Sequence, residues 1–157
     1  MHQPKRQGLV KVVFRLESDA WHGSATETLW GTLLSDGRVR LENSPFFAFG
    51  VSFRDIVAVE EANGELVFDR VVIFGGHSTY RIIKTSNEEA LFERYWKALR
   101  DIGCTYEEGR VLAVDLPPDT DVYAAYDALQ AGEDAGAWGF EEGHCGHPLE
   151  GRRASTS

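Results

Sequence analysis

The hydrophobic period of the chain changes near residue 79, and this change limits the folds that the sequence can adopt. Before it, apolar and polar residues alternate in runs such as Val10–Leu16 and Arg38–Asn43, which is the period of half-buried strands. After it, the segment from Phe92 to Ile102 carries apolar residues at helical spacing and stops at Gly103. The first half is therefore predicted to be a β-structure, and the second half to mix strands with helices.

Two turn signals divide the first half into hairpins. Asp36-Gly37 and Asn63-Gly64 both tolerate the positive φ angles of tight turns, and apolar alternating runs flank each of them. Five or so short strands joined in this way predict a small, strongly bent sheet or a partly open barrel over residues 9–78.

The second half predicts elements in the order β-α-β-β-α-β. They are a strand at Tyr80–Lys84, a helix begun by Ser86 and Glu89, strands at Cys104–Glu107 and Val111–Leu116, a helix capped by Asp119 or Thr120, and a strand at Ala137–Glu142. This is the ferredoxin-like order. The predicted fold class is thus α+β, with the N-terminal sheet or barrel packed on a C-terminal ferredoxin-like unit over residues 79–147.

The strand Val111–Leu116 indicates how the halves meet. Both of its faces are partly apolar, so one face is expected to pack on the helices and the other on the N-terminal sheet, which makes one compact unit. A homodimer joined through this second face is the alternative. Residues 1–8 and 148–157 lack periodicity and are predicted to be disordered.

The start of the chain favours a cytoplasmic protein. The apolar run that begins at Leu9 is broken by Lys11 and Arg15, which excludes the core of a signal peptide and a membrane span. The two cysteines, Cys104 and Cys145, are too few for a disulfide framework and are expected to be free thiols, with a single bridge between them as the alternative.

Charge is distributed unevenly along the chain. Residues 101–150 contain twelve carboxylates and one arginine, residues 1–100 are balanced, and the whole chain has a net charge of −9. An acidic half repels phosphate backbones and anionic lipids and attracts basic protein surfaces. Nucleic acid and membrane are therefore excluded as direct ligands. Val111–Leu116 also lacks the aromatic and basic residues of an RNA-recognition strand.

These charges favour a protein-interaction module that binds a basic partner, in the way that an immunity protein or antitoxin covers a cationic toxin. The predicted partner-binding residues are Glu107, Glu108, Asp127, Glu133, Asp134, Glu141 and Glu142. The alternative is an acidic surface that only keeps the protein soluble.

Several motifs resemble a family of small bacterial proteins, domain-of-unknown-function family 4265. The resemblance covers about residues 9–147 and rests on the runs Thr28–Trp30, Asn43–Ser52, Asp55–Val57, Gly76–Arg81 and Glu141–His144. It implies a single-domain bacterial protein of the cytosol. It brings no established activity, cofactor or catalytic residue to any position.

A second function hypothesis is a small enzyme or ligand-binding protein with a site between the two halves, near His77 and His144. The candidate pocket residues are Phe46, Phe49, Ser52, Asp55, His77, Ser78, Arg81 and His144. Exposed rings at Phe46 or Phe49 would anchor a partner or an apolar ligand. The sequence contains no nucleophile elbow, phosphate loop or metalloprotease helix, so no catalytic residue is assigned and an enzyme is disfavoured.

Histidines and a cysteine near the C-terminus raise the question of a metal. His77, His144, Cys145 and His147 offer the nitrogen and sulfur atoms that zinc prefers. Their spacing matches no usual zinc motif, so no cofactor is expected. We expect His77 and His144 to form hydrogen bonds that hold the end of the barrel against the last strand.

Overall fold

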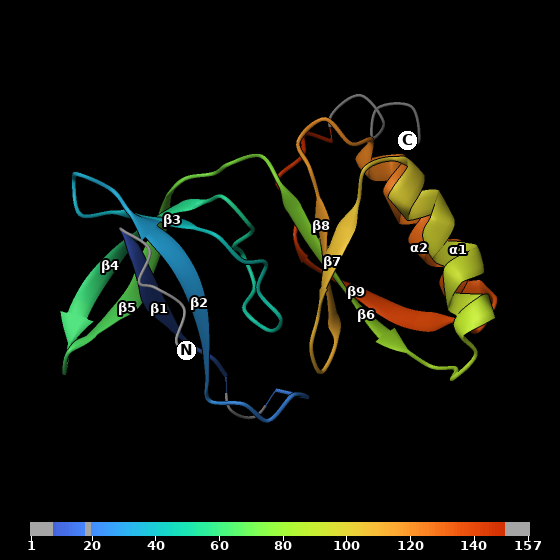
Figure 1. Cartoon of the computed structure of the whole chain (residues 1–157), viewed down its shortest axis with the longest axis horizontal. Helices are drawn as coiled ribbons and strands as arrows, with labels where there is room; N and C mark the ends of the chain where they lie inside the picture. Colours follow the sequence, from blue (N-terminus) through green and yellow to red (C-terminus); the bar gives the residue numbers. More distant parts are fainter. Residues whose placement is uncertain (1–7, 18–19, 150–157) are drawn as a thin grey trace, which may run out of the picture.

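The computed structural model describes residues 8–17 and 20–149, within which the chain forms nine strands and two helices (Figure 1). The first group of strands is β1 (Leu9–Arg15), β2 (Thr26–Leu33), β3 (Val39–Leu41), β4 (Ile56–Ala62) and β5 (Glu65–Ile73). The second group of elements is β6 (Ser78–Lys84), α1 (Glu89–Asp101), β7 (Thr105–Glu108), β8 (Leu112–Leu116), α2 (Val122–Asp134) and β9 (Trp138–His144). The ends predicted to be disordered lie outside the described residues, except for Gly8, Pro148 and Leu149.

Strands β1 to β5 form a closed barrel. Neighbouring strands pair in antiparallel fashion around it, and β1 then pairs in parallel with β5 at Val12↔Leu66 and Val13↔Val67. Closure leaves the barrel without an open sheet edge at this seam. Alternating side chains of the strands fill its interior, which is the predicted period-2 pattern, and the buried set is Val12, Phe14, Leu29, Val39, Leu41, Ala48, Val51 and Val57.

The hairpin turns were predicted correctly in place, and they differ in backbone conformation. Asn63 and Gly64 both have positive φ angles, 53° and 81°, as a type I′ turn requires. At the other turn only Gly37 has a positive φ, and the Asp36 carboxylate accepts a hydrogen bond from the Arg38 amide.

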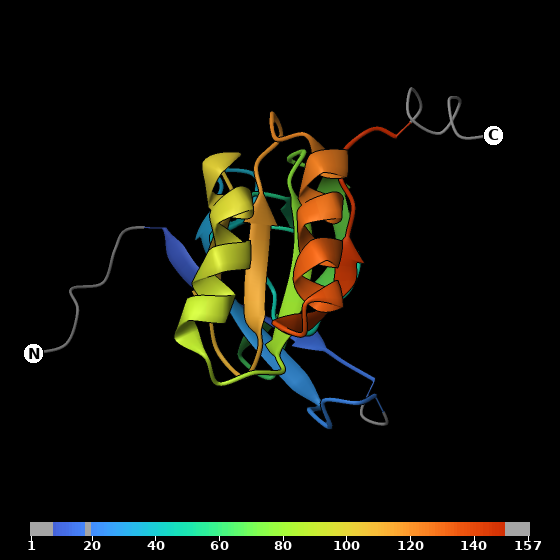
Figure 2. The same cartoon turned by 90° about the vertical axis from the view of Figure 1, so that its right-hand side faces the viewer.

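Strands β6 to β9 form a second sheet in the order β7-β8-β6-β9, with every neighbouring pair antiparallel. Helices α1 and α2 lie side by side across one face of this sheet (Figure 2), and the barrel lies beyond the opposite face (Figure 1). The helix-side core contains two large rings, Trp96 and Trp138, together with Ile82, Leu112 and Leu129. One face of the segment 111–116 therefore packs on the helices, and its other face is turned toward the barrel.

The fold class predicted from the sequence is wrong. The order of strands and helices after residue 78 is confirmed. However, the chain is mostly β and is built around a closed five-stranded barrel with a separate four-stranded sheet and two helices, rather than a bent sheet or open barrel on a ferredoxin-like unit. The seam of the barrel joins β1 to β5, which no turn connects, so local sequence signals do not indicate it.

The starts of both helices also differ from prediction. Helix α1 begins after Glu88, which makes no side-chain cap, and Ser86 instead accepts a hydrogen bond from the Glu88 amide. Helix α2 is capped by Asp121, whose carboxylate accepts from the amides of residues 123 and 124. Thr120 does not cap because its hydroxyl donates to the carbonyl of Ile102, where the other helix ends. Neither helix is long and apolar enough to cross a membrane, as far as residues 8–17 and 20–149 are concerned.

Gly132 in α2 provides a test of how tightly the helix packs on the sheet. A Cβ atom there would overlap the indole ring of Trp138, which is fully buried. Helix propensity alone favours Gly132→Ala by about 1 kcal/mol. We expect the clash to reverse the sign and lower the free energy of unfolding by about 1–3 kcal/mol in urea denaturation. The exposed neighbour gives the control: Ala131→Gly should cost about 1 kcal/mol. A stabilising Gly132→Ala would contradict this packing.

The cysteines should differ in reactivity. Both are free thiols; Cys104 is 2% exposed, and Cys145 is half-buried. Burial raises the pKa of the Cys104 thiol to about 12, so almost no thiolate forms at pH 8. A disulfide-exchange reagent at pH 8 should therefore titrate one thiol per native chain, removed by Cys145→Ser, and two thiols after unfolding. Rapid reaction of two thiols in the native state would show that Cys104 is accessible.

Candidate functional site

The segment between β3 and β4, residues 42–55, makes many of the contacts between the barrel and the second sheet; we call it the β3–β4 loop. On its barrel side, Glu27 of β2 is 8% exposed and binds three successive backbone amides of the loop. The amides of Phe46, Phe47 and Ala48 all donate to this carboxylate. A buried carboxylate needs such donors, so Glu27 fixes the course of the loop.

Arg81 of β6 holds the same loop from the other side. Its side chain is buried, donates to the carbonyl oxygen of Phe47 at 2.6 Å and lies 3.5 Å from that of Pro45. Its Nε faces Glu141 Oε2 at 3.5 Å, and its guanidinium lies 4.8 Å from the ring centre of Phe49. Burial lowers the pKa of Arg81, an effect that the charges of Glu141 and Glu27 oppose. Arg81 is thus a positioning residue for the loop.

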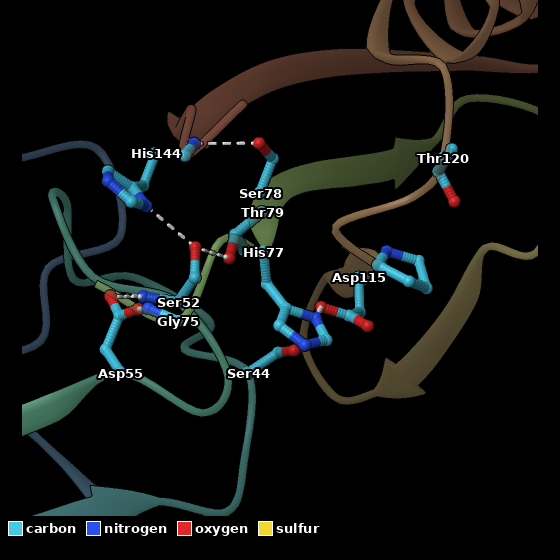
Figure 3. Close-up of polar contacts among 12 residues, drawn as sticks. Ser44, Ser52, Asp55, Gly75, His77, Ser78, Thr79, Asp115, Thr120 and His144 are labelled. Atoms are coloured by element: carbon cyan, nitrogen blue, oxygen red, sulfur yellow. Dashed lines mark hydrogen bonds and ion pairs between the residues drawn. The ribbon is translucent and has the colours of Figure 1, made fainter. Parts of the chain in front are cut away.

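His144 joins the end of β9 to the β3–β4 loop. Its Nδ1 lies 2.9 Å from the hydroxyl of Ser52, which in turn lies 2.6 Å from the hydroxyl of Thr79 (Figure 3). The imidazole also stacks on the exposed ring of Phe74, with 5.2 Å between ring centres. Ser52 is completely buried. It therefore serves as a hydrogen-bonding link and is not placed to meet a substrate.

Asp55 closes the same loop. Its carboxylate accepts the amide of Ser52 at 2.9 Å and that of Gly75 at 2.7 Å, so it ties the start of β4 to the segment that leads into β6. Burial raises the pKa of Asp55, although the two amides and the charges of His144 and His77 act in the opposite direction.

His147 forms a third link, within the second half of the chain. Its Nε2 lies 2.8 Å from the carbonyl oxygen of Pro117, so this nitrogen carries the proton and donates. Its Nδ1 then accepts from the hydroxyl of Ser78 at 2.6 Å, and Ser78 itself accepts from the amide of Gly146. Every polar atom of this set has a partner, which is typical of a structural histidine.

His77 differs from the other two histidines because it contacts two residues that line a cavity. Its Nδ1 lies 2.8 Å from Oδ1 of Asp115, a residue of β8 that is 8% exposed, and its ring contacts Phe53 edge-on. Burial raises the pKa of Asp115, against the opposing effect of the neighbouring His77. Asp115 and Phe53 line a cavity of about 70 Å³ whose other walls are Ser44, Thr105, Tyr106, Glu107 and Ala113.

None of the eight predicted pocket residues is among those that line this cavity. Ser52, Asp55, Ser78, Arg81 and His144 are instead used in the links between the two halves. Phe46 packs against Gly109, and Phe49 is 59% exposed above Arg81. In this segment Ala48 and Val51 belong to the barrel core, and the neighbouring phenylalanine rings do not.

Sequence reasoning missed Glu27 and Ser44. Glu27 lies in a strand whose alternation makes it inward-facing, so an acidic residue at an apolar position was the available signal. Ser44 gave no signal, because its place depends on the path of the loop. Within residues 8–17 and 20–149, no group of three or more His, Cys, Asp or Glu side chains is arranged to hold a metal ion.

The predicted partner-binding carboxylates are divided between the two edges of the second sheet. Glu107 and Glu108 lie on β7, and Glu141 and Glu142 lie on β9 at the opposite edge. Glu107 accepts the Ser44 amide, so part of its capacity is used inside the protein. The remaining three, Asp127, Glu133 and Asp134, are exposed on α2.

One side of α2 meets β9 in a surface that combines rings and carboxylates. We call Tyr126, Glu133, Phe140 and Glu142 the α2–β9 surface. Tyr126 is 46% exposed and contacts Phe140 edge-on, with 5.5 Å between ring centres. Glu133 accepts the Phe140 amide, and Glu142 accepts the hydroxyl of Tyr80.

Removing the Ser52 hydroxyl tests the link between the halves. Ser52→Ala leaves the Thr79 hydroxyl and His144 Nδ1 without this shared partner, so we expect the free energy of unfolding to fall by about 1–3 kcal/mol in urea denaturation. Ser35→Ala, in an exposed turn, is the matched control and should change it by less than about 0.5 kcal/mol. Equal effects of the two substitutions would show that the link does not stabilise the fold.

The raised pKa of Asp55 predicts that the stability of the fold depends on pH. Because its pKa is raised above the ordinary 3.8, the folded protein binds the proton more tightly than the unfolded chain. Its contribution to the free energy of unfolding should therefore fall as pH rises from 3.8 through the raised pKa and stay constant above it. Urea denaturation should show that the stability difference, wild type minus Asp55→Asn, shrinks as pH rises across this window. A difference that grows would mean that the amide bonds lower the pKa instead.

Comparisons with known proteins agree with this architecture. The chain superimposes on a hypothetical protein from Neisseria gonorrhoeae with a TM-score of 0.75 and 21% sequence identity, over 91% of this chain and 98% of the other; at that identity the likeness concerns the fold alone. No curated protein matches the sequence. The model of the family described as a domain of unknown function, DUF4265, matches residues 27–140, which include the β3–β4 loop, both helices and the start of β9. The chain belongs to the DUF4265 family.

Proposed function

We propose that the protein is a protein-binding module that uses the α2–β9 surface to bind a basic protein. The observation that carries the proposal is the exposed ring of Tyr126, which packs edge-on against the half-buried ring of Phe140, with Glu133 and Glu142 hydrogen-bonded beside them. Aromatic anchors surrounded by polar residues are the usual anatomy of a protein interface.

Exposed charge supports a basic partner. Asp127, Glu133 and Asp134 are exposed on α2, and Glu142 is exposed on the adjacent strand. The Asp134 carboxylate accepts from Gln130, which orients it along the same helix. These carboxylates are part of the chain's net charge of −9, which speeds the approach of a cationic surface at low salt.

The arrangement also supports a cation–π contribution. The exposed part of the Tyr126 ring is available to a partner's arginine or lysine, whose charge the neighbouring carboxylates would balance. Such a surface suits a stoichiometric inhibitor that covers a cationic protein, as an immunity protein or antitoxin does. Glu107 and Glu108 are left out of this proposal because they lie at the far edge of the sheet.

The test compares two variants that change the net charge equally. Asp127→Lys with Glu133→Lys alters the proposed surface, whereas Glu60→Lys with Glu61→Lys alters exposed residues of β4 on the barrel. Each tagged protein is used to capture partners from native lysate at 50 mM salt, and the affinity for the purified partner is then measured. We expect the first variant to bind about tenfold or more weakly and the control to bind like the wild type.

Two further results belong to this test. Tyr126→Ala, which changes no charge, should also weaken binding by about tenfold. A control variant that loses the partner to the same extent would show that only net charge matters, and retention by the α2–β9 variants would place the interface elsewhere. Capture of no stoichiometric partner by the folded wild type at low salt would also contradict the proposal.

A further inference from the structure

The cavity beside His77 is separate from the α2–β9 surface. It lies on the barrel side of the second sheet, between the β3–β4 loop and strands β7 and β8. Its volume of about 70 Å³ is several times the ~10–15 Å³ that one water needs and well below the ~300 Å³ at which drug-sized pockets begin. It therefore suits the head of a small molecule and not a nucleotide or a sugar chain.

The walls of the cavity are acidic and aromatic. Two carboxylates line it, those of Glu107 and Asp115, and no lysine or arginine does. Phe53 adds a ring, whereas the ring of Tyr106 packs on helix α1, on the opposite face of the sheet. The imidazole of His77 is hydrogen-bonded to Asp115 through Nδ1 and contacts the ring of Phe53, so it positions two of the lining residues. Carboxylates combined with aromatic rings are the usual lining of a site for an organic cation.

Ser44 gives an independent indication of a ligand. Its side chain is 2% exposed and lines the cavity, and its hydroxyl has no hydrogen bond to another residue in the part of the chain that the structure describes. Its amide is held by Glu107, so the residue is fixed in place. Figure 3 shows the hydroxyl directed toward the imidazole of His77. The hydroxyl therefore has the capacity to accept a hydrogen bond from a molecule in the cavity.

We propose that this cavity binds a small organic cation through a planar guanidinium head, with Asp115 and Glu107 as the charged acceptors and the Ser44 hydroxyl as a further acceptor. A guanidinium presents several donors in one plane, which matches two carboxylates and a hydroxyl, and its faces stack on aromatic rings. Burial raises the pKa of Asp115, and a bound cation would favour its ionised form.

The experiment titrates the ¹⁵N-labelled protein with methylguanidinium chloride and follows the backbone amides by NMR. We expect saturable shifts confined to residues 44, 53, 105–107 and 113–115, with a Kd of about 1 mM for so small a ligand. Methylurea, the neutral molecule of nearly the same shape, should bind about tenfold or more weakly. Sodium chloride at equal concentration should give no localised shifts.

Variants locate the site. Glu107→Gln and Asp115→Asn should each weaken methylguanidinium binding about tenfold or more, and Glu60→Gln on the barrel should bind like the wild type. If Asp115→Asn does not fold, the proposal is tested by the wild type alone, through the difference between its affinities for methylguanidinium and for methylurea. Equal affinity for methylurea, shifts that do not saturate, or equal loss in Glu60→Gln would overturn the proposal.

Discussion

The burial of one positive charge, that of Arg81, is the constraint on which the junction of the two halves depends. A guanidinium removed from water must be paired or solvated by protein groups. Arg81 finds its partners in the carbonyl oxygens of the β3–β4 loop and in Glu141 of β9. Since Glu27 binds the amides of the same loop from the barrel, one segment of backbone is held between a buried anion and a buried cation. Loss of either charge would release one side of the loop that carries the partners of the other, so the barrel and the second sheet are coupled through this loop.

The three described histidines of the second half show how one residue type takes different roles in one fold. His147 has a partner at both nitrogens, and His144 links Ser52 while its ring stacks on Phe74. His144 fits the expectation, made for it and for His77, of holding the end of the barrel against the last strand, whereas His147 was not part of that expectation and links segments of the second half. His77 instead pairs with Asp115 beside a cavity, which makes it the one of the three whose surroundings favour binding chemistry. The difference comes from the residues that contact each imidazole ring. The spacing of histidines in the sequence does not indicate these contacts.

The acidic residues of the chain have several different physical roles. Glu27, Asp55 and Asp115 are buried and hydrogen-bonded, and Glu107 holds the amide of Ser44. The exposed carboxylates of the proposed interface lie on α2 and at Glu142 of β9, where the exposed Tyr126 ring packs against Phe140. The proposed interface is therefore smaller and more specific than a whole acidic half.

The sequence by itself determined the local structure: the alternating strands of the barrel, both hairpin positions, two helices with apolar stripes, and the order of elements after residue 78. These depend on side-chain period and turn chemistry between near neighbours. Only the tertiary structure decided the closure of the barrel through Val12 and Leu66, the placement of Glu27 and Arg81 on opposite sides of one loop, and the cavity that Ser44 and Asp115 share. Each of these joins residues far apart in the chain, and their pairing is set by burial and by the need of buried polar groups for partners, which no local pattern records.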